Sequence, residues 1–187
     1  EPGSWEFGYV ESTGGVCLAV GDELWFYYSA YAGEPACPRE PWQVSGMYGN
    51  GAVGLAKLRR DGFAAMQARF AGADLLTRLL TFTGRHLFVN AQTAGARLSV
   101  ECRDRENHPI EPFTHSRCRA FMGNATAAEV RWQGADSLAA LAGRPVRFHF
   151  RLDRGELYAF WVSPSERGES RGYRGAGGPM TEGDEHP

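Results

Sequence analysis

Two stretches of alternating residues decide the fold: residues 97–103 read RLSVECR, and residues 146–152 read VRFHFRL. In each stretch every second residue is apolar, and the residues between are Arg, Ser, Glu or His. Successive side chains of a β-strand point to opposite faces, so this pattern predicts strands with one buried face and one wet face. On this interpretation Glu101 and His149 lie on the wet face.

The rest of the chain extends this pattern. Short apolar or alternating runs bounded by Gly, Pro, Asp and Asn recur about every ten residues, and helical periodicity is scarce. We therefore expect an all-β protein whose main part is an antiparallel β-sandwich, jelly-roll or concanavalin-like. Residues 75–83 are interpreted as a further strand. One helical turn is expected from about Ser137 to Ala142, with Asp136 as its cap and Gly143 at its end.

Two hairpins are predicted near the N-terminus, because Gly and Asp tolerate the positive φ of tight turns. The first joins residues 16–20 to 24–30, and the second joins residues 52–59 to 63–68. With the Pro- and Gly-rich loop 33–51 they form a first domain, 1–68, and the β-sandwich follows over 69–163. Residues 164–187 contain no Leu, Ile, Val or Phe, and a disordered C-terminal tail is expected there.

Composition and charge exclude two classes of partner. The 187 residues are 43% hydrophobic and 22% charged, and 20 Lys+Arg against 22 Asp+Glu give a formal net charge of −2. This balance lacks the basic footprint of a general nucleic-acid binder. No apolar run approaches the ~20 residues of a membrane helix. The first residue is Glu1 and no signal-like segment is present, so we expect a processed or excised part of a longer protein.

The four cysteines include no CxxC pair. Cys102 and Cys118 flank a polar loop, which leaves open both a disulfide that closes the loop and a pair of unpaired buried thiols. Together with His108 and His115 they carry the donor types of a zinc site, but their spacing matches no compact module. No metal or cofactor is therefore expected. The compartment stays open, with an extracellular or periplasmic location favoured.

Several stretches resemble the five-bladed β-propeller glycosidases. Residues 5–12 (WEFGYVES) and 14–29 (GGVCLAVGDELWFYYS) look like a propeller blade with a Gly-Asp hairpin and an aromatic returning strand. Residues 54–63 (GLAKLRRDGF) and 79–90 (LLTFTGRHLFVN) resemble the passage from the last blade into the C-terminal β-sandwich of bacterial proteins of the invertase and fructanase (family 32) architecture. The closing strands of that sandwich are similar to residues 139–148 and 157–163. The resemblance covers Trp5 to Ser163.

This resemblance implies a pair of blade-like hairpins followed by a sandwich, without the family's catalytic signatures. The Trp-Met-Asn-Asp-Pro-Asn-Gly type nucleophile motif and the Arg-Asp-Pro type stabiliser motif are absent. The pair Glu101-Cys102 matches the family's Glu-Cys acid/base motif in letters, but Glu101 lies on a sandwich strand and is interpreted as structural. Glycoside hydrolysis needs two carboxyl groups roughly 5 to 10 Å apart. Glu11 is the only carboxylate placed where a propeller would use one, so no catalysis is expected from this chain alone.

The candidate binding residues are aromatic, because sugar rings stack their apolar faces on Trp and Tyr. Trp42 and Tyr48 in the loop 33–51 are the candidate glycan-binding residues. The alternative interpretation is that these side chains pack against the protein itself. His86 and His149 are expected to be partly exposed strand residues and not catalytic bases. The aromatic residues expected in the core are Trp25, Tyr27, Trp132, Phe160 and Trp161.

The sequence thus favours the non-catalytic C-terminal β-sandwich portion of a glycoside-hydrolase-like protein, with a structural role and a contribution to glycan binding. Its expected partners are carbohydrate and either a propeller domain or a second copy of the chain. Two alternatives stay open. One is a free-standing carbohydrate-binding module, and the other is a glycosidase whose site is completed by other blades or chains.

Overall fold

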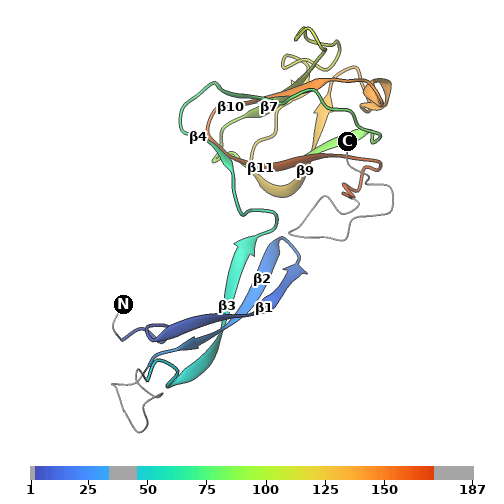
Figure 1. The fold of residues 1–187 in the computed structure, drawn as a ribbon. Coiled ribbons are helices and arrows are strands. Elements are labelled where there is room, and N and C mark those ends of the chain that lie inside the picture. Colours follow the sequence, from blue (N-terminus) through green and yellow to red (C-terminus); the bar gives the residue numbers. More distant parts are fainter. Residues whose placement is uncertain (1–2, 34–45, 171–187) are drawn as a thin grey trace. The chain divides into compact units, whose positions relative to one another are not determined.

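A computed structural model describes residues 3–33 and 46–170 (Figure 1). These residues are nearly all β, in antiparallel sheets that close into no barrel, which confirms the predicted fold class. No helix among the described residues has the length and apolar character needed to cross a membrane. The chain divides into two compact units, Glu1–Arg60 and Asp61–Pro187. The sequence had placed the first domain boundary at residue 68.

Unit 1 is a three-stranded antiparallel sheet in the order β1-β2-β3, with β1 (Tyr9–Val20), β2 (Glu23–Tyr31) and β3 (Gly51–Arg59). The first predicted hairpin is confirmed, because Val20 pairs with Glu23 across a turn in which Gly21 has a φ of 59°. The second predicted hairpin is wrong. β3 pairs along the whole of β2, and residues 66–68 pair instead with a strand of unit 2, where Ala68 joins the hydrophobic core.

Unit 2 contains two antiparallel sheets. The five-stranded sheet has the order β4-β11-β6-β9-β8, with β4 (Met66–Ala68), β11 (Gly155–Ser163), β6 (His86–Gln92), β9 (Asn124–Trp132) and β8 (Cys118–Arg119). The three-stranded sheet has the order β5-β10-β7, with β5 (Ala73–Leu76), β10 (Arg147–Leu152) and β7 (Leu98–Arg103). Figure 1 shows β10 and β7 in one layer and β11 and β9 in the other, as expected of a sandwich.

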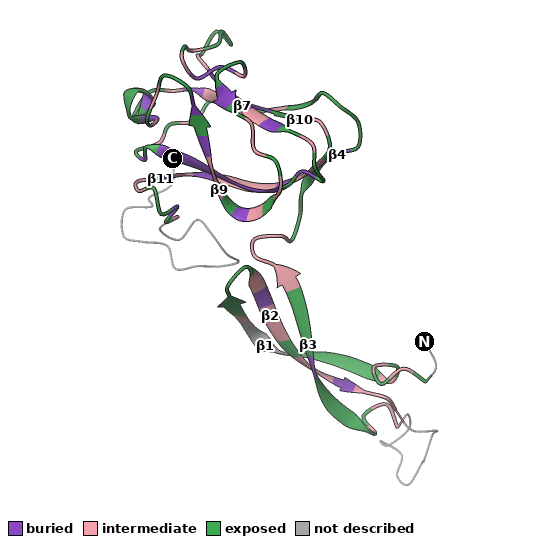
Figure 2. Cartoon of the chain, turned by 180° about the vertical axis from the view of Figure 1, so that it is seen from behind, coloured by how far each residue is buried: buried purple, intermediate pink, exposed green. Residues whose placement is uncertain are grey.

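The core of unit 2 lies between these two sheets. The apolar residues of the two deciding stretches are all buried, as the alternation predicted: Leu98, Val100, Cys102, Val146, Phe148, Phe150 and Leu152. Phe148 packs at ring-centroid distances of 5.8 Å from Phe82 and 5.9 Å from Phe160. Buried residues are concentrated on the strands of this unit, whereas most residues of unit 1 are exposed or intermediate (Figure 2). Burying apolar area between two layers is the main stabilising contribution to such a unit.

The predicted core aromatics divide between the two units. Trp132 and Trp161 are buried, and Phe160 packs against the core of unit 2. Tyr27 is exposed, which corrects the prediction, because the described residues of unit 1 form a single sheet layer. Trp25 is half-buried, with the Lys57 ammonium 4.5 Å from its ring centroid.

Three polar strand residues that were expected to be exposed or partly exposed are buried in unit 2. Glu101, His149 and His86 are only 6%, 7% and 8% exposed. A loop that follows β7, residues 104–117, folds back toward that strand: the backbone N–H of His115 donates to Glu101 Oε2 at 3.2 Å. His86 is covered on the other sheet, where its Nδ1 lies 2.8 Å from Glu129 Oε1. Strand alternation predicted the sheet face of Glu101 and His149 correctly but not the loop that covers it.

The C-terminal part of the described chain is ordered further than predicted. The Trp161 indole N–H donates to the carbonyl of Gly168 at 3.0 Å, and a Cβ on Gly168 would lie 2.8 Å from the Phe88 ring. Phe88 and Trp161 stack at 5.6 Å. Residues 164–170 therefore pack on the five-stranded sheet and do not belong to a disordered tail. The prediction for residues 171–187 lies outside the described residues.

Two smaller predictions are modified. The expected helical turn is a 3₁₀ turn, Ala139–Leu141, and its side-chain acceptor is Ser137 Oγ, 3.3 Å from the Ala139 N–H, in place of Asp136. The strand expected over residues 75–83 is β5 with one further bridge, between Leu80 and Val146.

Candidate functional site

Three tyrosines gather at one end of the sheet in unit 1. Tyr9 opens β1, Tyr31 ends β2, and the two are paired in register. Tyr48 comes from the turn before β3, and its ring centroid lies 5.1 Å from Tyr9 and 5.5 Å from Tyr31, edge-on to both. Tyr48 is 60% exposed and Tyr9 36%. The three rings form an accessible aromatic surface, which we call the tyrosine cluster.

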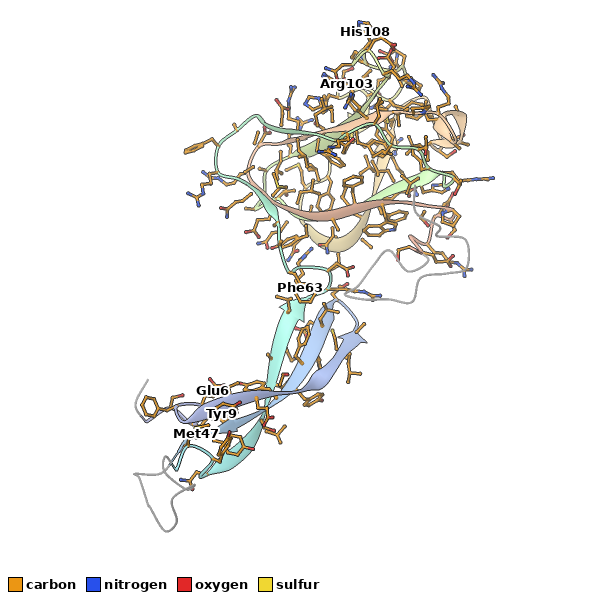
Figure 3. All side chains as sticks on the ribbon, in the orientation of Figure 1. Glu6, Tyr9, Met47, Phe63, Arg103 and His108 are labelled. Carbon is orange, nitrogen blue, oxygen red and sulfur yellow. The ribbon has the colours of Figure 1, made fainter. Side chains whose placement is uncertain are left out.

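Glycines make the tyrosine cluster geometrically feasible. A Cβ at Gly51 would lie 2.9 Å from Cε1 of Tyr31, so only glycine leaves room for that ring. A Cβ at Gly8 would lie 2.7 Å from the carbonyl oxygen of Met47 and 2.8 Å from the backbone of Gly33. Figure 3 shows Tyr9 near Met47 and Glu6 at this end of the sheet. Close backbone crossings of this kind require glycine.

A second aromatic group supports the same sheet. Trp5 lies over Gly54, whose Cβ would come within 2.6 Å of the indole, and its ring is 5.8 Å from that of Tyr28. The Tyr28 hydroxyl donates a hydrogen bond to Glu6 Oε1, and this bond raises the pKa of Tyr28 above its ordinary value. These contacts hold the N-terminal segment on the sheet.

The structure places Tyr48 in the tyrosine cluster, and Trp42 lies outside the described residues. Glu11 is exposed on β1, opposite Ser29. Two other carboxylates of the same unit are occupied by structural contacts: Glu6 accepts from Tyr28, and Glu23 accepts from the Trp25 indole and pairs with Lys57 at 3.2 Å. Tyr9 and Tyr31 were not predicted from the sequence, because an irregularity between Ser12 and Cys17 sets the register that pairs them.

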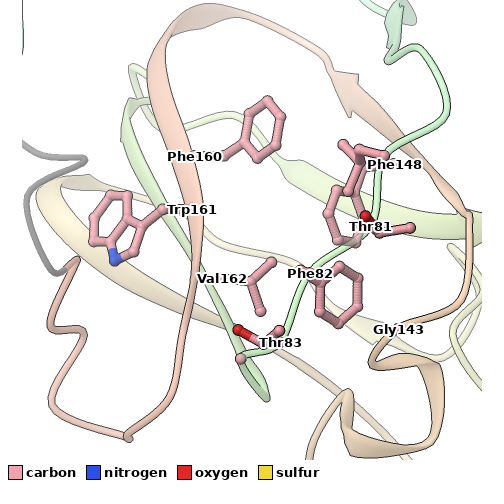
Figure 4. A pocket seen from close by; sticks show the side chains of 10 residues that line it. Thr81, Phe82, Thr83, Gly143, Phe148, Phe160, Trp161 and Val162 are labelled. Atoms are coloured by element: carbon pink, nitrogen blue, oxygen red, sulfur yellow. The ribbon is translucent and has the colours of Figure 1, made fainter. Parts of the chain in front are cut away.

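Unit 2 contains a pocket of about 750 Å³ (Figure 4). It is lined by residues 80–84, Gly143, Phe148 and residues 160–162. At the ends of this segment, Leu80 bridges to Val146, which precedes β10, and the N–H of the next residue, Arg85, donates to the carbonyl of Ser163 at the end of β11, at 2.8 Å. Phenyl rings give the pocket apolar walls, and the hydroxyls of Thr81 and Thr83 add polar groups.

A polar cluster lies on the outer face of the three-stranded sheet. His149 of β10 is paired in register with Glu101 of β7, and its Nδ1 lies 3.9 Å from Glu101 Oε1. His115, from the 104–117 loop, places its Nε2 3.0 Å from His149 Nδ1. The ligand atoms of the three residues all lie within 4.8 Å of one another. We call Glu101, His115 and His149 the Glu–His–His cluster.

Each member of the Glu–His–His cluster has a further partner. His149 Nε2 lies 3.1 Å from Asp74 Oδ1, and His115 Nδ1 lies 2.9 Å from Ser99 Oγ. Glu101 Oε1 accepts from Arg103 Nε at 2.8 Å. The cluster is therefore continuous from Asp74 on β5, across β10, to the loop that follows β7.

Burial dominates the electrostatics of the two imidazoles. Desolvation lowers the pKa of His115, against the raising effect of Glu101. Desolvation and then the charge of Arg103 lower the pKa of His149, against Asp74 and Glu101. Both rings therefore favour the neutral form more than an exposed histidine does. Burial raises the pKa of Asp74, but the hydrogen bond and charge of Arg151 and the charges of both histidines outweigh it, so the net shift is downward.

The two cysteines considered for a disulfide are free thiols in the structure. Cys118 Sγ accepts a hydrogen bond from the Val100 N–H at 3.3 Å. Burial raises the pKa of both Cys102 and Cys118, so both favour the neutral thiol.

The fold and these sites define an antiparallel all-β protein with a sandwich unit and an aromatic surface on a separate three-stranded sheet. The chain matches no protein-family model, no curated protein and no solved structure in searches of all three.

Proposed function

We propose that this chain is a non-catalytic portion of a glycoside-hydrolase-like protein, structural in its β-sandwich and glycan-binding through the tyrosine cluster. The observation that carries the proposal is the tyrosine cluster itself, three rings within 6.4 Å of one another, of which Tyr48 is the most exposed. Tyrosines offer both the flat apolar surface on which a pyranose or furanose ring stacks and a hydroxyl that hydrogen-bonds to sugar hydroxyls. Trp42 is the other glycan-binding candidate from the sequence, and its part in the proposal rests only on its position in the loop 33–51.

The structural half of the proposal is supported by the exposed apolar residues of unit 1. Val53 is 72% exposed, and the apolar residues Val10, Leu18 and Leu55 on β1 and β3 are exposed as well. Val53 and Leu55 lie two positions apart on β3 and therefore share one face of the sheet, and exposed apolar side chains on one sheet face are typical of surfaces that pack against a partner. We propose a propeller domain or a second copy of the chain as that partner.

Glycan binding is tested with the full chain on an array of soluble and immobilised glycans, followed by calorimetric titration with the best ligand. We expect binding that Tyr48→Ala reduces at least 10-fold, because the ring is lost, and that Tyr48→Phe reduces less, because the stacking face is kept. Phe70→Ala, which removes an 82% exposed aromatic ring from unit 2, is the matched control and leaves affinity unchanged.

Two results would contradict the proposal. One is the absence of affinity for any glycan, and the other is equal loss of affinity in Tyr48→Ala and Phe70→Ala. Cleavage of aryl-glycosides or fructans at enzyme-like rates would overturn the non-catalytic part. Light scattering tests the partner, since a chain that stays monomeric at high concentration argues against a second copy.

The pocket of unit 2 favours a second candidate, a free-standing carbohydrate-binding module whose ligand enters the sandwich. Its apolar walls and the two threonine hydroxyls are the supporting observation. Thr81→Val removes one hydroxyl with little change in volume. A glycan affinity that falls in Thr81→Val and not in Tyr48→Ala assigns the site to the pocket.

A further inference from the structure

The Glu–His–His cluster brings together three metal-ligating side chains from three separate segments, with Glu101 and His149 buried and His115 half-buried. We propose that Glu101, His115 and His149 bind a divalent transition-metal ion of the zinc class, with water completing the coordination. This inference is independent of glycan binding, because the cluster belongs to unit 2 and the tyrosine cluster to unit 1.

The outward-facing nitrogen of each histidine has the partner that a metal ligand requires. A ligating imidazole normally uses one nitrogen for the metal and donates its other N–H to a carboxylate, carbonyl or comparable acceptor, which fixes the tautomer. His149 has Asp74 Oδ1 at 3.1 Å from Nε2, and His115 has Ser99 Oγ at 2.9 Å from Nδ1. The remaining nitrogens, His149 Nδ1 and His115 Nε2, both face the interior of the cluster.

These two facing nitrogens leave room for one cation between them and the carboxylate. If Asp74 accepts from His149 and Ser99 accepts from His115, both facing nitrogens carry lone pairs directed at each other. A proton between His115 Nε2 and His149 Nδ1 removes this repulsion by forming the 3.0 Å hydrogen bond. A metal ion satisfies them equally and adds Glu101 as a third donor.

The distances are close to those of a coordination sphere. A tetrahedral ion with bonds of about 2.0–2.1 Å holds its ligand atoms about 3.3–3.4 Å apart. The His115–His149 separation of 3.0 Å must open slightly, and the His149–Glu101 separation of 3.9 Å must close slightly. The widest pair lies within 4.8 Å, and rotation of the Glu101 carboxylate, at the end of a flexible side chain, supplies the larger movement.

The charges around the cluster select the type of ion. Arg103 is paired with Glu101, and Arg151 with Asp74 at 3.1 Å, so the site has no surplus of negative charge. Mg²⁺ and Ca²⁺ require several oxygen ligands and are disfavoured here. Two imidazoles and one carboxylate suit Zn²⁺, Co²⁺ and Ni²⁺, which bind nitrogen strongly. Glu101 keeps its bond to Arg103 while it ligates, because each carboxylate oxygen has two lone pairs.

The test uses the full chain, stripped with a chelator and titrated with Co²⁺ in place of Zn²⁺. We expect one Co²⁺ per chain, visible absorption bands of a low-coordinate site, and displacement by Zn²⁺. His115→Gln is expected to abolish the bands, and Ser99→Ala to weaken affinity about 10- to 100-fold through loss of orientation. His86→Gln is the matched control, since His86 is a buried histidine paired with Glu129 on the other sheet, and it leaves Co²⁺ binding unchanged.

A second measurement needs no variant and so stays decisive if His115→Gln does not fold. In a ¹⁵N-labelled wild-type chain, Zn²⁺ is expected to shift the His115 Nε2 and His149 Nδ1 resonances and to leave those of His86 in place. The proposal is overturned if the wild-type chain binds no Co²⁺, if His115→Gln and His86→Gln alter binding equally, or if Zn²⁺ leaves the His115 and His149 resonances unshifted.

Discussion

Replacing Glu101 with alanine tests whether its carboxylate is buried and paired, as in the structure, or solvated on the strand surface. Glu101 is 6% exposed, accepts from Arg103 Nε at 2.8 Å and accepts from the His115 N–H at 3.2 Å. Removing one partner of a buried ion pair costs about 3–5 kcal/mol. The Arg103 side chain is 22% exposed and regains part of its hydration, which reduces the loss. We therefore expect Glu101→Ala to lower the free energy of unfolding by about 2–4 kcal/mol.

The assay is urea unfolding of the metal-stripped chain, followed by circular dichroism and intrinsic fluorescence, with the same m-value required of wild type and variant. Glu106→Ala is the control. Glu106 is exposed in the 104–117 loop, and its replacement is expected to change stability by less than about 0.5 kcal/mol. If Glu101→Ala costs no more than Glu106→Ala, the outer face of β7 is solvated, and the buried cluster on which the metal proposal depends does not exist.

Two further predictions concern backbone and thiols in unit 2. Gly155 has a φ of 124°, and a Cβ there would lie 2.0 Å from the Gln92 carbonyl oxygen, so Gly155→Ala is expected to lower the free energy of unfolding by more than about 2 kcal/mol in urea titrations. Gly143→Ala, at a φ of 74° with open space, should cost about 1 kcal/mol, and equal costs would refute the steric argument. Cys102 and Cys118 are buried thiols of raised pKa, so iodoacetamide at neutral pH should modify them only after unfolding, as read by peptide mass spectrometry. A disulfide-linked peptide in the unreduced digest would contradict the free-thiol state.

The sequence predicted the strands of unit 2 well where one face is apolar. The alternation of apolar and polar residues in 97–103 and 146–152 predicted both strands and the residues that point into the core, because burial of one strand face requires apolar residues with a period of two. The failure at residues 63–68 has a different cause. A Gly-containing turn signal at Arg60-Asp61-Gly62 indicates only that the chain changes direction there. The partner of the next strand is decided by packing, and Ala68 packs in the sandwich core.

The candidate sites could be predicted only in part, because they depend on pairings between distant segments. Tyr48 was identified as a candidate glycan-binding residue of the loop 33–51, but its neighbours in the tyrosine cluster follow from the irregular register of β1 and β2. Glu101 and His149 were both assigned to outward positions, yet neither strand indicates that the other is its neighbour. The pairing of β7 with β10 places them opposite each other, and His115 reaches them from a loop without periodicity.

The 104–117 loop and the residues after it also explain why β7 can end the three-stranded sheet. An edge strand exposes a row of unpaired backbone groups, which invites pairing with another chain. On β7 the outward backbone groups are all hydrogen-bonded. Leu98 exchanges N–H···O bonds with Phe121, and the Val100 N–H donates to Cys118 Sγ while its carbonyl accepts from the Trp132 indole. The Cys102 N–H donates to the carbonyl of Phe113, and its carbonyl accepts from the Ile110 N–H. The segment that closes this edge is the one that carries His115 onto the sheet. A metal ion bound by the Glu–His–His cluster would therefore tie that segment to β7 and β10, and its removal would loosen the covered edge before the core.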